Sequence, residues 1–110
     1  MKKLFVCFWL LVSGAALAQN AEATFWVDGV CGMCEKRIES ALLNTPGVRF
    51  ADWSKETREV KVAYSTKKLT EQRLHEIVAT AGHDTKKLRA KDADYAKVHA
   101  CCKYRELNAH

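Results

Sequence analysis

The sequence contains a single proline, Pro46, and only one long apolar run, Leu4–Val12, near its N-terminus. That run is too short to span a bilayer, and no second one follows it. There is also no internal repeat, no low-complexity segment and no Gly/Pro-rich linker between two domains. These absences argue against a membrane-spanning protein and against a multidomain one.

The charged residues are mixed along the chain rather than gathered by sign. Lys and Arg number 18 and Asp and Glu 13, which gives a net charge of +5. The basic residues do not form a stripe with aromatic side chains between them, which is the pattern expected of a nucleic-acid surface. We therefore expect a solvated surface of mixed charge and no nucleic-acid partner.

Residues 1–18 have the three parts of a secretory signal peptide. Lys2 and Lys3 are followed by the apolar run and then by small residues that end at Ala18. We expect cleavage there, so that the mature chain starts near Gln19, is secreted and has no stable membrane insertion. About 92 residues then remain, enough for one small domain, and Cys7 is removed with the signal peptide.

Three segments alternate apolar and polar residues and are therefore expected to be β-strands. The side chains expected to point inward are those of Ala23, Phe25, Val27, Ala51, Trp53, Val60, Val62 and Tyr64. Residues 54–57 are expected to turn the chain between the second and third strands. A short fourth strand is expected within residues 83–88, although its side chains are mostly polar.

Two segments have the apolar period of a helix. The first begins at Cys34 and ends at residues 44–47, and the second follows Thr70, a good N-cap, and ends at Gly82. Their expected apolar faces comprise Ile38, Ala41, Leu42, Leu74, Ile77, Val78 and Ala81. This order of elements predicts an α+β, ferredoxin-like β-α-β-β-α-β sandwich, with two helices on one face of an antiparallel sheet.

A C-terminal extension, residues 89–110, follows the domain predicted at residues 19–88. Either Asp92 or Asp94 is suited to cap a short helix that runs through Val98. Because no linker precedes the extension, we expect it to pack on the domain instead of forming another.

Four cysteines remain after signal cleavage: Cys31, Cys34, Cys101 and Cys102. An even count in an exported chain normally indicates disulfides. Adjacent cysteines rarely bridge to each other, however, because the small ring that they close is strained. The alternatives are disulfides between the two pairs or to another chain, a redox couple within the first pair, and shared ligation of a metal.

A thiol-disulfide exchange protein is the main alternative to a metal-binding one, since an oxidising compartment permits this chemistry. A thioredoxin-like protein, however, needs a longer chain, and typically has a proline between its cysteines and a later cis-proline. Here the only proline is Pro46. A disulfide-stapled interaction domain without metal chemistry is the third alternative.

The segment around the first cysteine pair resembles the heavy-metal-associated domain family. The resemblance rests on the order of elements, Cys31-x-x-Cys34 at the entrance to the first helix, the following "IESALLNTPGV", and the closing Ala81-Gly82-His83, and it covers roughly residues 22–88. This family includes copper chaperones, metal-binding repeats of copper-transporting ATPases and periplasmic mercury-binding proteins. With the signal peptide, the resemblance implies a non-enzymatic metal-binding protein of the bacterial periplasm.

Cys31 and Cys34 are the main candidate metal ligands. Soft thiolates select Cu(I) and Hg(II), and the start of a helix favours the thiolate over the thiol. Low coordination leaves the ion open to the thiols of a partner, which suits transfer by ligand exchange. We expect Cu(I), with Hg(II) or Zn(II) as alternatives, exchanged with a metal donor or acceptor such as a copper transporter or efflux component. A monomer is expected, and a metal-bridged dimer is the alternative.

Four further residues are candidate additional ligands or neighbours of the site. His83 follows the helix-ending glycine, and His99, Cys101 and Cys102 lie together in "HACCKY". Four thiolates around one ion would favour Zn(II) or a multi-copper cluster over a transfer site.

Other features near these ligands separate the chain from its relatives. The loop departs from the family pattern, because Gly29 stands two residues before Cys31 and Met33 lies between the two cysteines. Met33 is a further candidate for contact with the ion or a partner. His75 and His110 are expected to be solvated.

Overall fold

The computed structural model describes residues 19–106, and its centre is a three-stranded antiparallel sheet. The strands are β1 (Asn20–Trp26), β2 (Val48–Trp53) and β3 (Glu59–Ser65), and they lie in the order β1-β3-β2. β3 pairs with both neighbours, so that Val62 is opposite Ala23 on one side and Ala51 on the other. The predicted inward face is confirmed, because all eight side chains named for it are buried.

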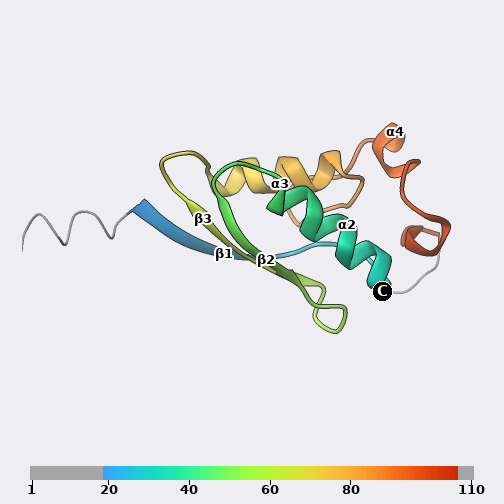
Figure 1. Cartoon of the computed structure of the whole chain (residues 1–110). Helices are drawn as coiled ribbons and strands as arrows, with labels where there is room; N and C mark the ends of the chain where they lie inside the picture. The colour runs from blue at the N-terminus through green and yellow to red at the C-terminus, as the bar shows by residue number, and fades with distance from the viewer. Residues whose placement is uncertain (1–18, 107–110) are drawn as a thin grey trace, which may run out of the picture.

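Two longer helices cover the same face of this sheet (Figure 1). They are α2 (Gly32–Leu43), which packs on β2, and α3 (Glu71–Thr80), which packs beside α2. Ile38 and Leu42 of α2 and Leu74 and Val78 of α3 are fully buried between the layers. This arrangement confirms the predicted ferredoxin-like fold class, in which a strip of apolar residues on each helix meets the apolar face of the sheet.

The ends of α3 follow the predicted capping chemistry. The Thr70 hydroxyl accepts a hydrogen bond from the Arg73 N–H at 3.2 Å, as expected of an N-cap residue. Gly82 follows the C-cap with a φ of +103°, a left-handed conformation that a residue with a Cβ rarely adopts. The chain therefore turns sharply at Gly82 and returns toward the start of α2.

The fourth strand predicted within residues 83–88 is not formed as a strand. A single antiparallel bridge joins Thr85 to Val27, and the Asp28 N–H donates to the Asp84 carbonyl at 2.8 Å. The Thr85 hydroxyl then accepts hydrogen bonds from the N–H groups of Lys87 and Leu88. These local bonds fold the segment into a turn, and so its backbone groups are not available for a longer ladder.

The described part of the extension, residues 89–106, packs against the end of the domain where α2 begins (Figure 1). It contains α4 (Asp92–Tyr95) and the short 3₁₀ helix η2 (Ala100–Cys102). Its buried side chains are those of Ala90, Tyr95, Val98, Cys102 and Tyr104. The prediction for α4 is wrong in detail, because Lys91 is its N-cap, no side chain caps it and it ends before Val98.

Within residues 19–106, no helix has the length and apolar character needed to cross a membrane. The predicted signal peptide lies outside the described residues.

Candidate metal centre

The first cysteine pair lies at the N-terminal end of α2. Cys31 is the N-cap residue with extended backbone, and its carbonyl accepts a hydrogen bond from the Glu35 N–H at 3.1 Å. Cys34 lies in the first turn with no exposed surface, and its sulfur is 3.7 Å from that of Cys31. Both thiols therefore lie where the unpaired N–H groups and the dipole of the helix favour negative charge.

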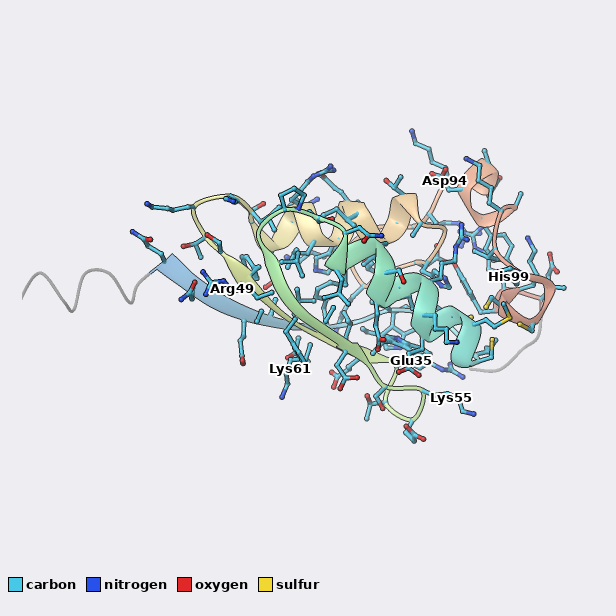
Figure 2. All side chains as sticks on the ribbon, in the orientation of Figure 1. Glu35, Arg49, Lys55, Lys61, Asp94 and His99 are labelled. Carbon is cyan, nitrogen blue, oxygen red and sulfur yellow. The ribbon has the colours of Figure 1, made fainter. Side chains whose placement is uncertain are left out.

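The extension brings the second cysteine pair to the same place. The Cys31 sulfur is 3.4 Å from the Cys101 sulfur and 3.3 Å from the Cys102 sulfur. Cys102 is fully buried, whereas Cys101 is exposed. Figure 2 shows sulfur atoms gathered between the start of α2 and the turn that follows His99. All four cysteines are free thiols, because these distances are far longer than a disulfide bond of about 2.05 Å.

The four thiols differ in how readily they ionise. Partial burial raises the pKa of Cys31, but hydrogen bonds from the Cys34 backbone and with the thiols of Cys102, Cys101 and Cys34 outweigh it and lower the pKa to about 7. Burial raises the pKa of Cys34, and it raises that of Cys102 far above its ordinary value. Cys31 is thus the most readily ionised thiol of the cluster, and a soft cation would displace protons from the other ligands.

Trp53 supports the loop that carries Cys31. Its indole N–H donates to the Val27 carbonyl at 3.0 Å, and its ring lies against Gly29. A Cβ at Gly29 would be 3.0 Å from the Trp53 ring and 3.1 Å from the Cys34 Cβ. Gly29, where the loop differs from the family pattern, therefore leaves room for the Trp53 ring beneath the cysteine pair.

Two residues that the sequence did not indicate hold the extension in place. The Tyr104 hydroxyl donates to the Gly82 carbonyl at 2.7 Å and accepts from the Asp84 N–H at 2.9 Å. Arg105 forms a bidentate pair with the Asp84 carboxylate, at 2.7 and 3.2 Å, and also donates to the Ala90 carbonyl. Burial raises the pKa of Asp84, but hydrogen bonds with Arg105 and the Ala90 N–H outweigh it, and the net pKa is lowered. Only the tertiary structure reveals this anchor, because its partners lie about 20 residues apart.

His83 is fully buried near the cysteine loop but does not belong to the sulfur cluster. Its Nδ1–H donates to the Asp28 carbonyl at 2.9 Å, and its ring stacks on that of Tyr104. The remaining ring nitrogen, Nε2, has no hydrogen-bond partner among the described residues. Burial lowers the pKa of His83 to about 4, so the ring is neutral. Within residues 19–106, the cysteine-containing group with spacing suited to one ion comprises Cys31, Cys101 and Cys102 and includes no histidine.

The other histidines have separate positions. His75 was expected to be solvated, and this expectation is wrong: its ring is 1% exposed, stacks on Phe25 at 3.9 Å and hydrogen-bonds the Thr85 hydroxyl. The turn at Thr85 covers its ring, whose Nδ1 lies 2.8 Å from the Thr85 hydroxyl oxygen. His99 is exposed at the start of η2, and His110 lies outside the described residues.

An open hollow lies beside the sulfur cluster. It is lined by Cys31, Cys101, Met33 and side chains on the first two turns of α2. Met33 is 45% exposed and is therefore available to a partner that approaches the cysteines.

Residues 24–84 of the chain match the sequence model of a protein family, the heavy-metal-associated domain. The chain belongs to the heavy-metal-associated domain family. Copper chaperone CopZ of Staphylococcus aureus is 36% identical over 59 residues, which are 53% of this chain and 87% of that protein. A solved CopZ metallochaperone is similar with a TM-score of 0.57 and 32% identity, over 59% of this chain and 98% of its own. Oxidized MerP from Ralstonia metallidurans CH34 has the same TM-score at 28% identity, over 60% of this chain and 93% of its own.

Membership in the heavy-metal-associated domain family fixes the general role of the chain. It is a heavy-metal-binding carrier domain and not an enzyme. The extension, with Cys101 and Cys102, lies beyond the residues that match the family. The family therefore accounts for the first cysteine pair but not for the second.

Proposed function

We propose that this protein carries or scavenges a soft metal ion outside the cytoplasm, that the ion is Cu(I), and that Cys31 and Cys34 are its principal ligands. The observation that carries the proposal is the placement of these two sulfurs, 3.7 Å apart at the start of α2. Thiolates are the ligands that Cu(I) prefers, and the helix terminus stabilises their charge. The similarity to CopZ supports copper as the cargo, and that to MerP supports Hg(II) as the alternative.

Release of the ion to a partner is the second part of the proposal. Cys31 lies at the rim of the open hollow, so an incoming thiol of a donor or acceptor can reach an ion bound there. A copper binding domain from HMA7, a P-type ATPase, has this fold, and the water-soluble region of the P-type ATPase CopA from Bacillus subtilis is 28% identical over 61% of this chain and 45% of its own. A copper transporter or efflux component is therefore the expected partner. The N-terminal signal-peptide pattern supports a periplasmic location.

The proposal is tested by anaerobic titration of the reduced protein with Cu(I) against a chromophoric Cu(I) chelator. One Cu(I) per chain is expected, and Cys31→Ser or Cys34→Ser is expected to lower the affinity by at least about 100-fold, because one thiolate is lost. Met33→Leu is the matched control, since it removes an exposed sulfur from the same turn but no thiolate. Retained affinity in both Cys→Ser variants would contradict the proposal. Preference for Hg(II) over Cu(I) in the same competition would show that the bound ion is Hg(II) instead of Cu(I).

A further inference from the structure

We propose that Cys102 is a third thiolate ligand of the ion held by Cys31 and Cys34, so that the C-terminal extension completes the metal site. This inference rests on the proposed function and deepens it. A heavy-metal-associated domain without the extension offers two sulfurs at this position. Here Cys101 and Cys102, about 70 positions away in sequence, place two more sulfurs beside that of Cys31.

The spacing of the sulfurs fits one shared ion. Metal–sulfur bonds of about 2.3 Å place two ligand sulfurs about 4.0 Å apart in a trigonal site and about 4.6 Å apart in a linear one. The Cys31 sulfur is 3.7 Å from that of Cys34 and 3.3 Å from that of Cys102, and both distances are close to the spacing of two ligands in a trigonal site. An ion bound at Cys31 is therefore within reach of both the Cys34 and the Cys102 sulfur. The distances are shorter than those of a linear two-sulfur site.

The two cysteines of the extension have different surroundings. Cys102 is 0% exposed and its sulfur contacts that of Cys31, whereas Cys101 is exposed and contacts Cys31 from the solvent side. A buried cysteine often serves only as a small apolar side chain. The Cys102 sulfur, however, lies 3.3 Å from that of Cys31, and an apolar filler does not require a thiol neighbour. Both cysteines belong to the group whose spacing suits one ion, and burial assigns the third ligand to Cys102 rather than to the exposed Cys101.

The position of Cys102 is set without the metal. Tyr104 and Arg105, two and three residues after it, are fixed to Gly82 and Asp84 by the hydrogen bonds and ion pair described above. The Arg105 guanidinium also lies over the Tyr95 ring, at 4.3 Å from its centroid. The extension is thus anchored through groups that are not ligands, and the third sulfur is preorganised for binding.

A third thiolate changes what the site does with its ion. Two-coordinate Cu(I) is open to attack by a partner thiol, whereas a third sulfur occupies the position that such a thiol would take. The protein is therefore expected to retain Cu(I) against weak competitors and to release it when the extension moves away from α2. This behaviour favours scavenging or controlled delivery over rapid exchange.

The test compares Cu(I) affinities of the reduced protein and its variants by competition with the chromophoric chelator. Cys102→Ala is expected to weaken binding by at least about tenfold, because one of three sulfur ligands is lost. Cys101→Ser tests whether the exposed neighbour is the third ligand instead, and its loss of affinity is expected to be smaller than that of Cys102→Ala. Arg105→Gln keeps all four cysteines but removes the anchor, and is expected to weaken binding by about tenfold, as is typical when support of a ligand is lost.

The outcomes separate this inference from the proposed function. If Cys102→Ala and Arg105→Gln both bind Cu(I) like wild type while Cys31→Ser does not, the third ligand is refuted and the two-cysteine carrier stands. Equal losses in Cys101→Ser and Cys102→Ala would refute the assignment to Cys102. If the wild-type protein does not bind Cu(I), both proposals fail. Should Cys102→Ala not fold, as judged by circular dichroism of the apo protein, Arg105→Gln decides the question.

Discussion

The sulfur atoms of Cys31 and Cys102 lie 3.3 Å apart, although 71 positions separate the two residues in the chain. Cys31 is the N-cap of α2 in the heavy-metal-associated domain, and Cys102 ends η2 of the extension. The contact therefore joins the part of the chain that the family explains to the part that it does not. Substitutions in the extension are therefore expected to alter metal binding at Cys31.

Gly82 is predicted to be essential for docking of the extension. Its φ is +103°, and a Cβ there would lie 2.7 Å from both the Asp94 carbonyl oxygen and a methyl group of Val98. Gly82→Ala is therefore expected to lower the free energy of unfolding by at least about 2 kcal/mol, measured by urea denaturation, because strain and overpacking add.

Gly32→Ala is the matched control, because a Cβ at Gly32, in the first turn of α2, meets nothing within 4 Å. Alanine is the better helix former, and this variant is expected to be neutral or more stable by up to about 1 kcal/mol. A loss of stability in Gly82→Ala no larger than in Gly32→Ala would show that the extension does not pack against Gly82.

The Tyr104 hydroxyl is predicted to stabilise the fold through its two hydrogen bonds to Gly82 and Asp84. Tyr104→Phe leaves a buried carbonyl and a backbone N–H without this partner, and is expected to lower the unfolding free energy by about 1–3 kcal/mol. Tyr64→Phe is the control, because the buried Tyr64 has no hydroxyl hydrogen bond among the described residues. Equal stabilities of the two variants in thermal unfolding would contradict the role of Tyr104.

His83 is predicted to make the protein less stable at acidic pH. Burial lowers the pKa of His83 from 6.5 to about 4 in the folded state, so between these values the unfolded state binds more protons. The unfolding free energy is therefore expected to fall as the pH decreases from about 6.5 to about 4, by up to about 3 kcal/mol. Burial also lowers the pKa of His75, which adds in the same direction.

The contribution of His83 is isolated by His83→Phe, which keeps an aromatic ring against Tyr104 but does not titrate. The variant is expected to show a shallower pH dependence in urea denaturation, and its Cu(I) stoichiometry is expected to be unchanged because His83 is outside the sulfur cluster. An unchanged slope would show that the pKa of His83 is not lowered on folding.

Export is predicted to leave a mature chain that starts at Gln19. Expression in a bacterium with a periplasm is expected to place the protein in the periplasmic fraction, and N-terminal sequencing is expected to read Gln19-Asn20-Ala21. A cytoplasmic protein that keeps Met1 would contradict the proposed location.

The fold was predictable from the sequence wherever apolar periodicity alone decides the structure. Alternation identified the inward faces of all three strands, and the cap at Thr70 and the stop at Gly82 followed from local backbone chemistry. The predictions were wrong where a side chain takes up the hydrogen bonds of the backbone, or where a distant segment buries a residue expected to be exposed. The Thr85 hydroxyl turns residues 83–88 away from a strand, and the same turn buries His75.

The site was predictable only in part for the same reason. Cys31-x-x-Cys34 at a helix start is a local pattern, and the sequence therefore indicated it directly. The positions of Cys101 and Cys102 depend instead on the contacts of Tyr104 and Arg105 with residues about 20 positions earlier. No periodicity encodes such contacts, and so the sequence offered His83, His99, Cys101 and Cys102 as equal candidates. The structure brings the two cysteines to Cys31 and neither histidine into the cysteine cluster.

X-ray absorption spectroscopy at the copper edge tests the completed site most directly, because it counts the sulfur neighbours of the ion. The reduced protein loaded with one equivalent of Cu(I) is measured beside the Cys102→Ala variant. Three sulfur neighbours are expected in the wild type and two in the variant. Two sulfur neighbours in both proteins would contradict the claim that the extension completes the metal site.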